Sequence, residues 1–204
     1  MSLLQVTRWN YKRNKCEMHQ HLEHSMLLEE ETEFKEQGLL PYLEGGLFQL
    51  DAVVEMIDAY CDYNFVYSGT IGKAIGTEVN LSVFDVESKM TMMNTYIIEA
   101  LLEHNVTIMD VKTGKSVIDE AMGFVIDANE AKPVKKTKGK VTKGAKWRDP
   151  KELILDLLVA RGWDDECKTA DRRADEAKES LASTVASNGT LEAFNELTEE
   201  QQNA

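Results

Sequence analysis

Two acidic clusters constrain the fold of this chain more than any other feature of its sequence. The first is MLLEEETEF at 26–34, and the second is LDAVVEMIDAYCDYNFV at 50–66. Each spaces its carboxylates three or four residues apart, which aligns them along one side of an α-helix. In the second cluster the acids fall within a stripe roughly 60° wide on the helix surface. The members of that stripe are Asp51, Glu55, Asp58 and Asp62.

The second acidic stripe lacks the counter-charges of an ordinary solvated helix face. No Lys or Arg occurs between Lys35 and Lys73, and like charges repel by about 0.2–0.5 kcal/mol per neighbouring pair. Apolar residues flank the stripe, so its carboxylates need a counter-charge, and a hard divalent cation would supply one. Glu29 and Glu33 share a face in the first cluster, with Glu30 beside Glu33. If the two helices pack antiparallel with their acidic faces opposed, the two clusters would form a cage of carboxylate oxygens suited to Mg²⁺ or Mn²⁺. The alternative to a metal site is an acidic helix face that is merely solvated.

Composition limits the classes of protein that this chain can be. Its 204 residues are 43% hydrophobic and 29% charged, as in a globular protein. With 23 Lys and Arg against 36 Asp and Glu, the net charge is −13, which argues against nucleic acid and anionic membranes as partners. No apolar stretch approaches the roughly 20 residues of a membrane span. The N-terminus lacks a signal-peptide core, and the cysteines Cys16, Cys61 and Cys167 are widely spaced, so we expect a cytoplasmic protein.

Apolar periodicity predicts an all-α fold, with helices long enough to form a bundle. Residues 105–130 fit either a small β-hairpin or a short helix at 116–122. Residues 131–148 form a basic segment, and the chain is polar and acidic from Asp164 onward. The first expected helix spans residues 15–37 and stops at Gly38, and residues 39–46 are expected to form a loop. The second helix spans 47–67 or beyond and ends near Gly76. The third and fourth expected helices span 86–103 and 150–159.

The order of the acidic motifs resembles a known superfamily. An EExxE motif, a short loop and an ExxD motif follow one another in the all-α nucleoside triphosphate pyrophosphohydrolases, which include MazG, phosphoribosyl-ATP pyrophosphohydrolase and dimeric dUTPases. This chain is most similar to the phosphoribosyl-ATP pyrophosphohydrolase-like branch of phages and bacteria, in which an LxEExxEF helix precedes a helix ending in D-x-x-Y-V-x-x-G-T. The segments here read MLLEEETEF and EMIDAYCDYNFVYSGTIGKAIG, and GKVTKGAKWRDPKEL at 139–153 resembles the closing GKxxK…W…P segment.

The resemblance implies a fold and an assembly. It predicts a MazG-like helical bundle over residues 1–160, in which 105–130 looks like an insertion and 131–148 is the basic segment. The polar acidic tail at 161–204, which we expect to be helical or partly disordered, has no counterpart in the resemblance. A homo-dimer or homo-tetramer is implied, located in the cytoplasm, or in the host cytoplasm if the chain is phage-encoded.

The resemblance also implies a reaction. It predicts Mg²⁺-dependent hydrolysis of a (deoxy)nucleoside triphosphate to the monophosphate and pyrophosphate, with Mn²⁺ as the alternative cofactor. The alternatives are a hydrolase of the same fold that acts on a nucleoside diphosphate or a signalling nucleotide, a non-catalytic nucleotide- or metal-binding regulatory protein, and a purely structural acidic bundle.

The same resemblance assigns residues to this site. A carboxylate not fully engaged by metal would be the general base, with Glu30, Glu33 and Asp58 as candidates. Contacts to the substrate would come from Lys89 and Asn94 on the third helix and from Lys140 and Lys143 in the basic segment. The metal ligands would be Glu29, Glu30, Glu33, Glu55 and Asp58, with Asp62 as a further acid of the same site.

Overall fold

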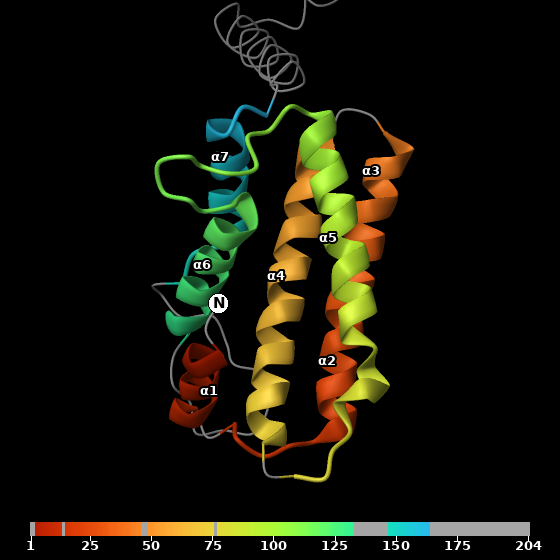
Figure 1. Cartoon of the computed structure of the whole chain (residues 1–204), viewed down its shortest axis with the longest axis vertical. Coiled ribbons are helices and arrows are strands. Elements are labelled where there is room, and N and C mark those ends of the chain that lie inside the picture. Colours follow the sequence, from red (N-terminus) through yellow and green to blue (C-terminus); the bar gives the residue numbers. More distant parts are fainter. Residues whose placement is uncertain (1–2, 14, 46–48, 76, 133–146, 164–204) are drawn as a thin grey trace, which may run out of the picture. The chain divides into compact units, whose positions relative to one another are not determined.

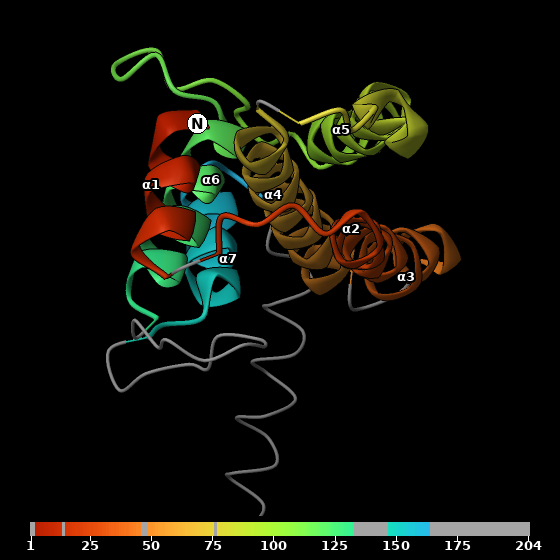
Figure 2. The ribbon, with the colours of Figure 1, turned by 90° about the horizontal axis from the view of Figure 1, so that it is seen from below.

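The longest helix, α4 (Gln49–Ala74), is the centre of the structure. The structure is a computed structural model that describes residues 3–13, 15–45, 49–75, 77–132 and 147–163. All of these belong to one unit, Met1–Asp164, and a second unit, Asp165–Ala204, lies outside the described residues. Helices α2, α3 and α5 gather on one side of α4, and α1, α6 and α7 on the other (Figures 1 and 2). Because it is covered on several sides, α4 buries apolar residues around much of its circumference.

The described residues confirm the all-α prediction. They contain no β-strand, and a single isolated bridge joins Met109 to Ser116. The third predicted helix has the expected bounds, and the last begins at Pro150 as expected. None of the described helices is long and apolar enough to cross a membrane. Around α4 the elements are α1 (Leu3–Lys12), α2 (Gln20–Glu33), a π-helical turn η1 (Phe34–Leu39), α3 (Leu40–Glu44), a 3₁₀ turn (Leu81–Phe84), α5 (Val86–Glu103), α6 (Val117–Glu130) and α7 (Pro150–Ala160).

The first acidic helix differs from the prediction at both ends. It begins at Gln20 rather than near Lys15, and helical structure continues past Gly38 through η1 and α3. Gly38 is instead a packing position, since a Cβ atom there would lie 2.5 Å from Cγ and 2.9 Å from the backbone N of Met56. The missing side chain therefore lets η1 approach the backbone of α4. The predicted loop over 39–46 is correspondingly wrong for residues 40–44, which form α3.

Helix α1 has no counterpart in the prediction, and it explains two glycines of α4. A Cβ atom on Gly72 would lie 2.6 Å from Oγ1 of Thr7, and one on Gly69 would lie 3.0 Å from Nδ2 of Asn10. These glycines do not end the helix, which continues to Ala74. They form the surface on which α1 packs.

The ambiguous segment 105–130 is a loop followed by a helix. The hairpin alternative is reduced to the single bridge between Met109 and Ser116. The helical alternative is borne out by α6, which runs well past the predicted 116–122. A capping box starts this helix, in which Ser116 and Asp119 each bond the other's backbone N–H. Helix α6 packs on both α4 and α7, so this segment is part of the bundle.

Candidate metal and phosphate site

Helices α2 and α4 run antiparallel and in direct contact (Figure 1). Near the start of α2, Glu23 accepts hydrogen bonds from Thr70 Oγ1 at 3.0 Å and from Lys73 Nζ at 2.7 Å, near the end of α4. At the other end of the pair, Gly38 packs against Met56. Between these two contacts the register places the acidic motifs of the two helices opposite each other, which is the arrangement that a shared cation site requires.

The carboxylates of both helices act on Glu30. Burial, followed by the charges of Asp62, Glu33, Glu29 and Asp58, raises the pKa of Glu30 to about 9. Two of these charges come from α4 and two from α2 itself. The predicted ligands of both helices therefore form one acidic cluster, and that cluster is short of positive charge.

Asp58 is the least solvent-exposed carboxylate of this cluster. It is 7% exposed, and burial together with the charge of Asp62 raises its pKa to about 7 although Lys151 acts in the opposite direction. Its Oδ1 atom is buried without a hydrogen-bond partner in the described part of the chain. Buried carboxylate oxygens are normally paired, so this atom is positioned to accept a ligand.

Helix α6 contributes residues that the sequence did not indicate. Burial raises the pKa of Asp62, while the charge of Lys132 and a hydrogen bond with Asn129 lower it. Lys132 Nζ also donates to Asn129 Oδ1 at 2.7 Å. The segment interpreted as an insertion thus ends near the amide of Asn129, and the basic segment that follows it begins with the ammonium group of Lys132 at the edge of the acidic cluster.

Helix α1 holds this end of α6 in place. Trp9 Nε1 donates to the backbone carbonyl of Asn129 at 2.9 Å. Arg13, which is 3% exposed, donates from Nη2 to the carbonyls of Asn129 and Glu130 at 3.3 Å each and of Lys132 at 2.7 Å. A helix leaves its last carbonyls without partners, and these two side chains satisfy them. They thereby fix where Asn129 and Lys132 meet Asp62.

Helix α7 contributes a second ammonium group. Lys151 Nζ lies 2.6 Å from Oε2 of Glu55 and 3.8 Å from Oδ2 of Asp58. Burial by itself would lower the pKa of Lys151, but the hydrogen bond to Glu55 and the charges of Glu55, Asp58 and Asp149 raise it. Sequence reasoning missed this residue because its position beside α4 depends on how α7 packs.

The structure describes two of the four predicted substrate-binding residues, Lys89 and Asn94. Lys89 forms an ion pair with Glu31, a neighbour of the predicted ligands rather than one of them. Asn94 is half-buried on the same helix, five residues and about 140° of rotation away from Lys89, so the two side chains leave α5 in different directions. Lys140 and Lys143 lie outside the described residues.

The donor chemistry of the cluster fits a hard divalent cation. All six predicted ligands offer carboxylate oxygens, which Mg²⁺ and Mn²⁺ prefer. Asp58 Oδ1, which has no hydrogen-bond partner among the described residues, and the raised pKa of Glu30 both indicate a deficit of positive charge that such a cation would correct. Within the described ranges, no three side chains of Asp, Glu, His or Cys converge closely enough to hold a metal ion.

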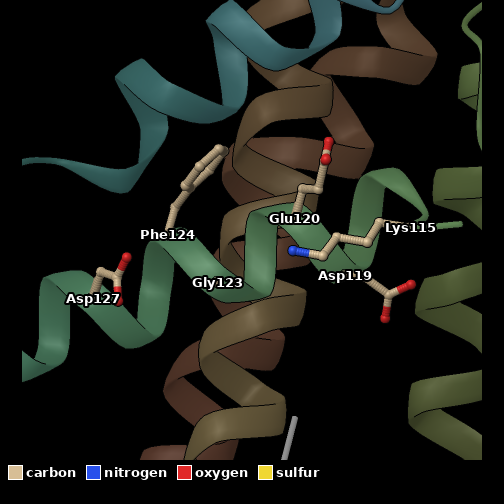
Figure 3. A pocket seen from close by; sticks show the side chains of 6 residues that line it. All are labelled: Lys115, Asp119, Glu120, Gly123, Phe124 and Asp127. Carbon is tan, nitrogen blue, oxygen red and sulfur yellow. The ribbon is translucent and has the colours of Figure 1, made fainter. Parts of the chain in front are cut away.

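A separate hollow of about 320 Å³ lies on α6 and has no part in this cluster. Figure 3 shows Glu120 and Phe124 pointing to one side of the helix and Asp119 to another. Two of the acids that line the hollow already have structural partners, since Asp119 is part of the capping box of α6 and Glu120 accepts a hydrogen bond from Arg161 at 2.7 Å. Its lining residues are Lys115, Asp119, Glu120, Gly123, Phe124 and Asp127.

Comparisons of the chain with protein-family models, with curated proteins and with solved structures found no match. The likeness to the pyrophosphohydrolase superfamily therefore depends on the motifs quoted above.

Proposed function

We propose that this protein is a Mg²⁺-dependent nucleotide pyrophosphohydrolase with a MazG-like helical bundle. It would convert a (deoxy)nucleoside triphosphate to the monophosphate and pyrophosphate. The observation that carries the proposal is the register of α2 against α4, in which Asp62 and Asp58 of α4 act together with Glu33 and Glu29 of α2 on the carboxyl group of Glu30. The EExxE and ExxD motifs give independent support from the sequence.

Magnesium bound at the cluster would neutralise the charge of the polyphosphate and orient the attacking water. Glu30, Glu33 and Asp58 are the candidates for general base. The base would be the one of these carboxylates that is not fully engaged by the metal and is therefore ionised and able to take a proton from water. The water oxygen forms a bond to phosphorus, the phosphoanhydride bond between the α- and β-phosphates breaks, and the proton passes to the carboxylate.

The substrate's phosphates need cations on the protein because the chain as a whole is acidic. Lys132 and Asn129, at the end of α6, offer an ammonium and an amide beside Asp62. Lys140 and Lys143 remain candidates for the same task, as do Lys89 and Asn94.

The test is incubation of the full chain with a panel of NTPs and dNTPs plus Mg²⁺, with products separated by chromatography. We expect monophosphate and pyrophosphate from at least one nucleotide, and no product in EDTA. Glu33→Gln and Asp58→Asn should each lower the rate by roughly 100-fold or more, as expected for loss of an acid–base group or metal ligand. Glu99→Gln is the control, because this exposed acid on α5 is not one of the predicted ligands, and its rate should stay near that of the wild type.

Other outcomes would replace the proposal. Turnover of only a diphosphate or a signalling nucleotide would change the substrate class. Nucleotide-dependent thermal stabilisation without product would indicate a binding protein. If Mg²⁺ had no effect and Glu33→Gln simply stabilised the fold, the acidic cluster would be structural.

The proposal includes the assembly and location of the protein. We propose a homo-dimer or homo-tetramer in the cytoplasm, with a nucleotide as the small-molecule partner. Large apolar side chains exposed on α2, α3 and α5 support self-association.

A further inference from the structure

The ammonium group of Lys151 lies where a divalent cation would bind to α4. Its Nζ is 2.6 Å from Glu55 Oε2 and 3.8 Å from Asp58 Oδ2. These two acids are three residues apart and so lie on one side of α4. Lysine is a compact point charge on a flexible stem, so it can balance these carboxylates in the absence of metal.

Capping and core packing fix the backbone of Lys151, whereas its side chain is held by ion pairs at the partly exposed edge of the cluster. Asp149 caps α7 by accepting a hydrogen bond from the backbone N of Lys151 at 3.1 Å, and Pro150 occupies the first turn. Ile154 and Leu158 are fully buried and dock the helix into the core. The Lys151 side chain is about one-third exposed, at 33%, so its head group can swing away without any change in the fold.

The pairing of Lys151 leaves the deeper oxygen of Asp58 unused. Lys151 approaches Oδ2, whereas Oδ1 has no hydrogen-bond partner within the described ranges. A single ammonium therefore satisfies this pair of acids only in part. A divalent cation could contact more of these oxygens and would bring twice the charge.

We propose that Lys151 is a built-in counter-cation of the acidic cluster, which a divalent metal ion must displace from Glu55 and Asp58 when it binds. This inference rests on the proposed function, because it takes the cluster to be a metal site. The exchange lowers the affinity for free metal, and in the metal-free fold Lys151 offsets part of the negative charge of the acidic cluster. It makes Lys151 a residue that sets metal affinity.

The test is titration of the full chain with Mg²⁺ by calorimetry, comparing the wild type with Lys151→Met. Methionine keeps an unbranched side chain of similar length and removes the charge. We expect Lys151→Met to bind Mg²⁺ roughly tenfold more tightly, the effect of removing one charge-assisted pair of ordinary strength. In EDTA the variant should unfold at a lower temperature than the wild type, and Mg²⁺ should raise its unfolding temperature by more.

Two controls separate local exchange from a change in net charge. Lys89→Met removes a lysine of similar exposure, 28% against 33%, from an ion pair with Glu31, which is not one of the predicted ligands, and its Mg²⁺ affinity should stay within about twofold of the wild type. Lys151→Arg keeps a cation at the site and should also bind Mg²⁺ no more tightly than the wild type. Circular dichroism of each variant in EDTA reports whether the helices are retained.

The outcomes distinguish this inference from the proposed function. Equal Mg²⁺ affinity in the wild type and Lys151→Met would overturn the exchange and leave the metal site standing. An equally large gain in Mg²⁺ affinity in Lys89→Met or Lys151→Arg would also overturn the exchange. Absence of Mg²⁺ binding in every variant would overturn the metal site itself. If Lys151→Met fails to fold in EDTA but folds with Mg²⁺, the role as counter-cation is supported directly.

Discussion

Single carboxylates in this protein differ in how well folding supplies them with partners. Glu23 is buried but receives hydrogen bonds from Thr70 and Lys73. Glu30 has only acidic neighbours among the charges that act most strongly on it, and Asp58 has one buried oxygen without a partner in the described residues. A buried acid with partners contributes to stability, whereas one without them favours its neutral form or a bound cation.

This difference predicts how stability depends on pH in the absence of metal. Folding raises the pKa of Glu30 from 4.5 to about 9 and that of Asp58 from 3.8 to about 7. Each such group stabilises the fold below its unfolded pKa, and this contribution is lost as the pH rises through the folded pKa. In EDTA the free energy of unfolding should therefore fall between about pH 4.5 and pH 9. Saturating Mg²⁺ should oppose the loss, because it favours the charged carboxylates.

Thermal unfolding at pH 5 and pH 8 in EDTA measures the effect. Glu30→Gln should reduce the loss of melting temperature between the two pH values by at least about 3 °C, which corresponds to roughly 1 kcal/mol in a chain of this size. Comparing variants removes the contribution of titrating groups elsewhere. Glu31→Gln is the control, and its melting temperature should change with pH as that of the wild type does. An identical pH dependence in Glu30→Gln and the wild type would contradict the assignment of an unbalanced acidic cluster.

At the scale of elements, the approach of α2 and η1 to α4 decides whether the two acidic motifs meet. The contact at Gly38 lies just beyond Glu33, and the π-helical turn there follows the first motif directly. Such turns recur at functional sites in helical proteins. A side chain at Gly38 would hold the two backbones apart at this point.

Substitution of Gly38 tests this contact. Gly38→Ala should destabilise the fold by about 1–3 kcal/mol, because its Cβ would overlap the backbone N and the side chain of Met56. Gly123→Ala is the matched control: Gly123 is in α6, a Cβ there meets nothing within 4 Å, and alanine should stabilise the helix by up to about 1 kcal/mol. Urea unfolding of both variants in EDTA gives the two free energies. A neutral or stabilising Gly38→Ala would show that η1 can move away from α4 without cost.

At the scale of the whole described unit, apolar exposure is uneven. Among the described residues, most of the large apolar side chains that remain exposed belong to helices α2, α3 and α5, which gather on one side of α4 (Figure 1). Tyr42 of α3 donates a hydrogen bond to Glu103 of α5, and the residues next to them in the sequence, Leu43 and Leu102, are exposed to 64% and 60%. A second copy of the chain would cover such a surface, in line with the proposed homo-oligomer.

This surface predicts the effect of charge on assembly. Leu43→Glu and Leu102→Glu should each weaken self-association by roughly tenfold or more, since a carboxylate would be buried at an apolar contact. Val111→Glu is the control, because Val111 is 96% exposed in the loop before α6. Sedimentation equilibrium of the full chain gives the mass and the dissociation constant. A monomeric wild type, or equal effects of all three changes, would argue against assembly through this surface.

Local patterns in the sequence were enough to predict several elements. Helix α5 has the bounds that its apolar spacing predicts, and α7 begins at the expected proline. The carboxylates of the two motifs could be aligned on their helices because the spacing of three and four is a property of the helix itself. Gly38 was misjudged because a glycine that ends a helix and one that permits a close contact look the same in the sequence.

The acidic faces of α2 and α4 follow from the sequence because they depend on neighbours along one helix. Their antiparallel register, the unpaired oxygen of Asp58, and the approach of Asn129, Lys132 and Lys151 were decided by tertiary packing. These contacts join residues far apart in the chain, and their geometry depends on how whole helices pack around α4. Local periodicity carries no information about which helices become neighbours, so the basic side of the cluster could be recognised only in the folded protein.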